Sequence, residues 1–105
     1  MPAEPKTLGN VTADDFRPLQ GESFAFELGP ERTISVLLLD VTERAAHRRP
    51  SASRNPFSII VRAPAGTSAP QGIYGLSHPA LGRLAPFFSD IGPDVEGRCY
   101  QAVFS

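Results

Sequence analysis

Apolar and polar residues alternate along much of this chain, and a period of two is typical of β-strands with one buried face. The clearest case is "ESFAFEL", where Phe24, Phe26 and Leu28 share one side of the predicted strand. Segment 33–43 is apolar on both sides in its middle, so we expect this strand to lie centrally in the sheet or to curl. Six strands are predicted in all: ESFAFEL, TISVLLLDVTE, NPFSIIVRAP, QGIYGLSH, RLAPFFSDI and RCYQAVF.

One short helix is predicted ahead of these strands, in "VTADDFRPLQG". Thr12 suits the N-cap position, and the two aspartates that follow it suit the positive end of the first turn. Pro18 prevents a long continuation, so we expect one or two turns. Phe16 and Leu19 are then expected to reach the core.

The segments together predict a mainly β protein, because eleven prolines and nine glycines in 105 residues punctuate short apolar stretches. We expect a small six-stranded antiparallel barrel or sandwich, meander-like in topology, with the one short N-terminal helix. Residues 1–10 are predicted to be a flexible tail, and residues 11–105 a single β domain. The connection at 43–55 lacks periodicity and is predicted to be a mobile basic loop.

The segment "SHPALG" predicts a hairpin turn between two of the strands. A four-residue loop over 79–82 would begin with Pro79 and use a positive φ at Gly82, leaving His78 and Arg83 paired at its base. Catalysis by His78 would need a titrating partner, and the sequence offers no strong one. We therefore interpret His78, Pro79 and Gly82 as structural turn residues.

This pairing gives the hairpin large apolar side chains on both of its faces. They are Tyr74, Leu76, Ala85 and Phe87 on one face, and Ile73, Leu84 and Phe88 on the other. Either a bulge near Pro86 turns one phenylalanine, or another element or another chain covers one face. The residues predicted to form a candidate interface are Tyr74, Leu76, Phe87 and Phe88.

Charge gives no sign of a nucleic-acid or membrane partner, because ten basic and eleven acidic residues leave a net charge of −1. The 43–55 segment is locally basic, but it lacks aromatic residues that could stack on bases, so we interpret it as a solvated loop. Its basic residues are Arg44, His47, Arg48, Arg49 and Arg54. We therefore expect a protein partner or self-association, with a small ligand as an open alternative.

Neither a metal site nor a catalytic site is predicted, and no cofactor is implied. The two histidines are thirty-one positions apart and match no metal-ligand spacing. Asp90, Asp94 and Glu96 could suit calcium, but their segment is more simply a hairpin loop closing on Gly97. No GxSxG element or phosphate-binding glycine loop occurs.

The expected compartment is the cytoplasm. Cys99 is the single cysteine and cannot form an internal disulfide, which suits reducing conditions. The first ten residues lack the apolar core of a signal peptide, and no apolar stretch approaches the ~20 residues of a membrane span.

Four blocks of the chain resemble a family of small bacterial domains of unknown function. They are TADDFRPLQGESFAFEL, PFSIIVRAP, PQGIYGLSHPALGRLAPFFSDIGPD and the terminal YQAVFS. Members of that family are often encoded beside proteins with phage-tail-collar domains. The resemblance therefore implies an accessory role in a tail-like or collar-protein system, and it assigns no catalytic residues.

Two hypotheses about function follow. The first is a non-enzymatic domain that binds protein, as an assembly or accessory factor. The second is a barrel that binds a small ligand or carbohydrate in a pocket between Tyr74, Phe87 and Tyr100.

Overall fold

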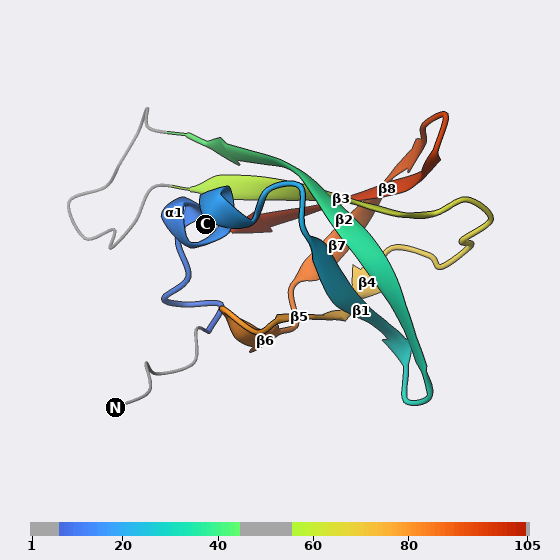
Figure 1. Ribbon diagram of the computed structural model, residues 1–105, viewed down its shortest axis with the longest axis horizontal. Coiled ribbons are helices and arrows are strands. Elements are labelled where there is room, and N and C mark those ends of the chain that lie inside the picture. Colours follow the sequence, from blue (N-terminus) through green and yellow to red (C-terminus); the bar gives the residue numbers. More distant parts are fainter. Residues whose placement is uncertain (1–6, 45–55, 105) are drawn as a thin grey trace.

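The computed structural model describes residues 7–44 and 56–104, and it is mainly β, as predicted (Figure 1). A short helix α1 (Ala13–Phe16) leads into a 3₁₀ turn η1 (Arg17–Leu19). The described part of the chain has eight strands, not six. They are β1 (Ser23–Gly29), β2 (Arg32–Glu43), β3 (Phe57–Pro64), β4 (Gly72–Ile73), β5 (Gly75–His78), β6 (Gly82–Leu84), β7 (Phe87–Pro93) and β8 (Gly97–Phe104).

The two extra strands arise because two predicted strands are each divided. The chain bends at Tyr74, between β4 and β5, and again at Ala85 and Pro86, between β6 and β7. Proline has no N–H to donate to a sheet, so Pro86 is a natural point of interruption. The Tyr74 N–H donates to the Pro86 carbonyl oxygen at 3.3 Å and holds the two bends together. The two halves of each divided strand then have different neighbours. β5 pairs with β1 and β6, whereas β4 pairs with β7, and β7 also pairs with β8.

All eight strands form one antiparallel sheet in the order β4-β7-β8-β3-β2-β1-β5-β6. The sheet curls into a half-barrel, so the predicted barrel or sandwich is corrected to this form (Figure 1). A meander describes β1, β2 and β3, but the other neighbour of β3 is β8, the last strand. The C-terminal strand therefore lies in the middle of the sheet.

The predicted hairpin exists, but its register is displaced by one residue. His78 pairs with Gly82, and only Pro79 to Leu81 lie between them. The Leu81 N–H donates to the His78 carbonyl oxygen at 3.0 Å, which closes the turn. Gly82 has the expected positive φ, +81°, but it belongs to β6 rather than to the loop. The loop is one residue shorter than predicted.

This displacement reverses the predicted faces, because neighbouring residues of a strand point to opposite sides. Leu76 pairs with Leu84, and Phe88 pairs with Gly72. The buried side chains of Leu76, Leu84 and Phe88 share the inner side. Phe87 instead pairs with Ile73 on the outer side. The hairpin has one apolar inner face and a smaller apolar area outside, rather than two full apolar faces.

The core fills the inner face of the half-barrel. At one end Phe16 of α1 packs against Phe24, Phe57 and Phe104, with ring centroids 5.8–6.2 Å apart. Figure 1 shows α1 beside the C-terminal end of the chain, where this contact is made. Phe16 and Leu19 are both buried, as predicted. The helix therefore covers one end of the core.

A local contact fixes the start of this helix at the predicted position. The Asp15 carboxylate accepts hydrogen bonds from the N–H of Thr12 at 2.8 Å and from its hydroxyl at 3.1 Å. Thr12 has extended backbone angles, as an N-cap residue should. The chain then enters η1 through Pro18 and leaves the helix, as the sequence predicts.

Part of the predicted tail and most of the predicted basic loop lie outside the described residues. These parts are residues 1–6 and 45–55, the latter including His47, Arg48, Arg49 and Arg54. Arg44 is described and exposed, and its N–H donates to the Pro56 carbonyl oxygen at 2.7 Å. No helix within 7–44 or 56–104 has the length and apolar character needed to cross a membrane.

Candidate functional site

Three exposed apolar side chains lie side by side on the outer face of the sheet. Ile73 of β4 pairs with Phe87 of β7, and the register of Phe88 with Ala102 places Val103 of β8 on the other side of Phe87. Their exposed fractions are 70%, 51% and 66%. We call these three residues the apolar row. Because a small protein gains stability only from apolar surface that it buries, the row does little for the fold.

The apolar row overlaps the predicted interface at a single residue. Leu76 and Phe88 are buried in the core, so neither is available to another chain. Tyr74 is partly buried, with its ring 5.2 Å from that of Phe26. Phe87 alone of the four predicted residues is exposed.

Two residues of the row were missed by the sequence analysis for different reasons. Ile73 was assigned to the face opposite Phe87 because the hairpin register was displaced. Val103 could have been found, because it alternates with the buried residues Ala102 and Phe104 along β8. Strand alternation therefore carries the signal for Val103, and only the correct register carries it for Ile73.

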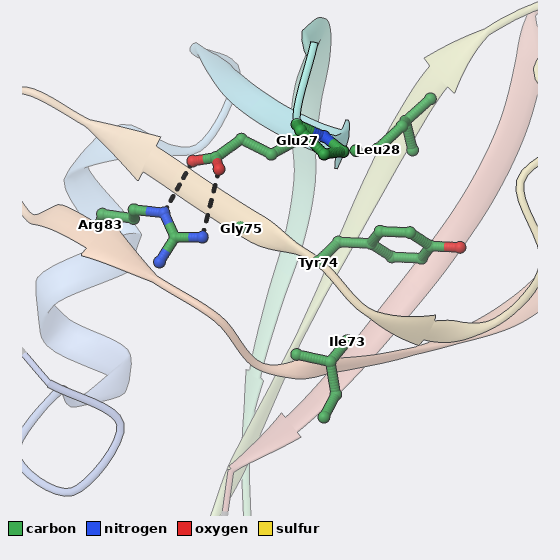
Figure 2. Close-up of a pocket in the computed structure, with 8 residues that line it drawn as sticks. Glu27, Leu28, Ile73, Tyr74, Gly75 and Arg83 are labelled. Carbon is green, nitrogen blue, oxygen red and sulfur yellow. Dashed lines mark hydrogen bonds and ion pairs between the residues drawn. The ribbon is translucent and has the colours of Figure 1, made fainter. Parts of the chain in front are cut away.

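A shallow hollow of about 300 Å³ lies next to Ile73. It is lined by Glu27, Leu28, Gly29, Pro30, Ile73, Tyr74, Gly75 and Arg83 (Figure 2). Leu28, Ile73 and Tyr74 give it apolar walls, and the Tyr74 hydroxyl donates to the Pro70 carbonyl oxygen. The hollow thus joins the apolar row at one of its ends.

A two-bond ion pair forms the charged rim of this hollow. Arg83 donates from Nε to one Glu27 oxygen at 2.8 Å and from Nη2 to the other at 3.1 Å. Figure 2 shows the two side chains meeting over the strand that carries Gly75. A Cβ on Gly75 would lie 2.7 Å from the Glu27 carboxylate carbon and 2.9 Å from Arg83 Nη2, so a glycine lets the pair close. The hydrogen bonds from Arg83 lower the pKa of Glu27.

His78 has a carboxylate partner that its sequence neighbourhood did not reveal. Its Nε2 lies 2.8 Å from Glu22 Oε1, because β5 pairs with β1 and brings these distant positions together. Its Nδ1 accepts a hydrogen bond from the Ala80 N–H at 3.0 Å, so Nε2 carries the proton and donates to Glu22. The ring also packs against Phe24, 4.8 Å away. Because both ring nitrogens have hydrogen-bond partners, neither is free to act as a general base.

The acidic segment closes the β7–β8 hairpin, as predicted. Asp94 Oδ1 accepts from the N–H groups of Glu96 and Gly97, and the Asp94 N–H donates to the Gly97 carbonyl oxygen. Arg62 donates to Asp94 Oδ2 at 2.9 Å from Nε, and its Nη1 lies 2.9 Å from Glu96. These bonds, above all that from Arg62, lower the pKa of Asp94 to about 2. Both Asp94 carboxylate oxygens therefore accept hydrogen bonds from other groups of the protein.

The described residues hold no cluster suited to a metal ion, and no group of three or more His, Cys, Asp or Glu side chains gathers among them. Cys99 is a free, buried thiol, and burial raises its pKa. A buried thiol with a raised pKa is a poor nucleophile.

The three aromatic residues of the second hypothesis do not surround a common pocket. Tyr100 is fully buried, and its hydroxyl donates to the Ala69 carbonyl oxygen at 2.7 Å. Phe87 lies on the outer face, whereas Tyr74 packs toward the core.

Comparison with known protein families supplies one match, over residues 11–104, to the model described as Domain of unknown function (DUF6916). The chain belongs to this family. The match covers nearly the whole described fold, from the residue before the N-cap to the end of β8. It confirms the predicted resemblance to an uncharacterised domain family. No curated protein and no solved structure matches the chain.

Proposed function

We propose that this domain is a non-enzymatic protein-binding domain whose docking surface is the apolar row of Ile73, Phe87 and Val103. The supporting observation is that three large apolar side chains remain exposed on three adjacent strands, while the inner face is packed. Burying one phenylalanine is worth about 1.5–3 kcal/mol. A partner that covers the row gains this free energy on association.

The titratable groups described above support binding rather than catalysis. His78 is held at both nitrogens, and the Asp94 oxygens accept hydrogen bonds from its own hairpin and from Arg62. Glu27 is occupied by Arg83. A catalytic residue needs a free pair of electrons or a free proton directed at a substrate, and these groups direct theirs at the protein.

The family resemblance adds a more specific context to the proposal. We propose that the partner is a component of a phage-tail-like or collar-protein system, in which this domain serves as an accessory or assembly factor. A cytoplasmic location, where the single free thiol is stable, belongs to the same proposal.

Site-specific photocrosslinking in the cell that naturally expresses the protein tests the docking surface. A benzophenone amino acid is placed at position 87, at position 103, or at position 95 as the control. Val95 is fully exposed and apolar but lies in the β7–β8 turn, away from the row. We expect one crosslinked protein from positions 87 and 103 and none from position 95. Equal crosslinking at all three positions, or none at any of them, would overturn the proposal.

The crosslinked partner is then purified, and its affinity is measured with the Phe87→Ser variant. We expect at least a tenfold loss of affinity, because central aromatic residues dominate protein interfaces. The Val95→Ser variant should bind as the wild type does. Sedimentation of the wild type alone distinguishes a different partner from a second copy of this chain.

A further inference from the structure

Within residues 7–44 and 56–104, two strand edges that border the hollow have no strand partner on the side facing it. β1 pairs with β5 only through Ala25, Phe26 and Glu27. Of its next two residues, Gly29 pairs with Arg32 of β2, and Leu28 is the extra residue where the register shifts, so neither pairs with β5. β4 ends the sheet on the other side of the hollow and pairs only with β7.

The bend at Tyr74 creates this arrangement. β5 runs beside β1 as far as Gly75, and then the chain turns away at Tyr74 so that β4 can pair with β7. The half-barrel therefore stays open between the end of β1 and β4. The hollow occupies this opening, with residues 27–30 on one side and residues 73–75 on the other.

We propose that an extended segment of the partner protein binds in this opening as an added strand, between the end of β1 and β4. The inference rests on the proposed protein-binding function and specifies the form of the partner. Unpaired strand edges bind extended chains through main-chain hydrogen bonds, while neighbouring pockets select side chains. Here the added strand would extend the apolar row at Ile73.

The lining of the hollow defines the side chains that such a segment must carry. Leu28, Ile73 and Tyr74 offer apolar contacts, so one inward residue of the segment is apolar or aromatic. Arg83 is 60% exposed, and among the described residues none accepts a hydrogen bond from its Nη1. An acidic side chain two positions along the segment, on the same face, can accept from this nitrogen. The segment is therefore extended, apolar and acidic.

The shape of the hollow favours a peptide over a free small molecule. Its volume of about 300 Å³ is at the lower end of the range for small-molecule pockets, and it is a shallow surface depression. A peptide gains most of its contact from the two strand edges, so a shallow side-chain pocket is sufficient. A free sugar or metabolite would lack those main-chain bonds.

The probe is a displayed library of random nine-residue peptides, selected against the wild-type domain. The enriched peptide is synthesised and its affinity measured by fluorescence anisotropy. We expect a motif with an apolar residue followed two positions later by Asp or Glu. In a strand with a neighbour on each side, one set of alternate N–H groups faces the end of β1 and the other set faces β4. Methylating either set of alternate peptide nitrogens should therefore weaken binding at least tenfold.

Two charge reversals on the domain locate the peptide. Arg83→Glu, at the rim of the hollow, should weaken binding at least tenfold, whereas Arg44→Glu, on another exposed position, should not. Thermal unfolding confirms that both variants are folded. A peptide with Lys in place of its acidic residue should recover affinity for the Arg83→Glu variant.

Three results would overturn the inference. They are the absence of any enriched motif, binding that ignores both nitrogen methylation and Arg83→Glu, and a wild-type dimer that Arg83→Glu dissociates. The last result would assign the opening to a second copy. None of the three tests whether the apolar row is a docking surface. Crosslinking from positions 87 and 103 tests that claim separately, with an intact partner. The proposed function can therefore survive the failure of this inference.

Discussion

Phe87 and Phe88 are neighbours on one strand and carry the same side chain, yet their surroundings are opposite. Phe88 is fully buried on the inner face, with its ring 5.0 Å from that of Phe26. Phe87 is half-exposed on the outer face and has Ile73 as its cross-strand neighbour. One position along a strand thus separates a residue needed for folding from one available for binding. The composition of β7 alone does not distinguish them.

The contrast extends to the two faces of the sheet. The inner face is held by apolar packing among aromatic rings and aliphatic side chains. The outer side carries the ion pairs of Glu27 with Arg83 and of Arg62 with Asp94. Exposed ion pairs contribute little because water screens them. The free energy of folding therefore comes mainly from the inner face, and the outer face is free to vary with function.

The largest effect is expected from truncating the two phenylalanines separately. Phe88→Ala should destabilise the domain by about 3–5 kcal/mol, because it leaves a cavity in the core. Phe87→Ala should destabilise it by less than about 1 kcal/mol, since half of that side chain is already in water. Urea unfolding measures both. Equal losses would show that the outer face also carries the fold and would remove the basis of the comparison.

Strand alternation was sufficient to predict that Phe24 and Phe26 share the inner face of β1, and both are buried. Each stands between less apolar neighbours, so their burial follows directly from the sequence. The hairpin of 72–93 was harder, because apolar residues occupy both of its faces. A turn of three residues and one of four both suit "HPALG", and the choice between them decides which phenylalanine is buried. Pairing with β1 and β8 makes that choice.

A smaller loss is expected for His78→Gln, at the turn that sets this register. The substitution removes the ring contact with Phe24 and at least one of the two hydrogen bonds of the imidazole. A typical hydrogen bond is worth about 0.5–1.5 kcal/mol, so we expect a destabilisation of about 1 kcal/mol. Affinity for the partner should not change. A lost affinity with an unchanged melting temperature would instead indicate a functional histidine.

The candidate site was only partly predictable, again for physical reasons. Phe87 was identified because a large aromatic in an apolar-rich hairpin is conspicuous. The hollow could not be predicted, since Glu27 and Arg83 are fifty-six positions apart and meet only through the pairing of β1, β5 and β6. The same long-range pairing joins His78 to Glu22. Contacts of this kind depend on topology, which alternation does not encode.

Within the apolar row, Ile73 and Phe87 should be weakly coupled. Directly paired residues on neighbouring strands interact by about 0.2–1 kcal/mol. A double-mutant cycle with Ile73→Ala and Phe87→Ala should give a coupling in this range. The matched cycle of Ile73→Ala with Val103→Ala joins strands that are not neighbours and should be additive within about 0.3–0.5 kcal/mol. Additivity in both cycles would mean that the row is three separate side chains rather than one packed surface.

The smallest effect is expected from the ion pairs of the outer side, and acid titration of Asp94 measures it. In the folded state Arg62 and the hairpin N–H groups hold the pKa of Asp94 at about 2, below its ordinary value of 3.8. A depressed carboxyl pKa stabilises the folded state above the unfolded pKa, and this contribution disappears as the pH falls through the folded one. Stability should therefore decline between about pH 4 and pH 2.

Glu27 and Asp90 have lowered pKa values and change in the same direction, so the contribution of Asp94 is the difference between wild type and Asp94→Asn. The variant keeps an oxygen for the hairpin N–H groups but carries no charge for Arg62, so its unfolding free energy should fall less steeply with acid. Identical slopes for the two proteins would show that this ion pair is fully screened by water and that the outer face contributes nothing to the pH dependence at this hairpin.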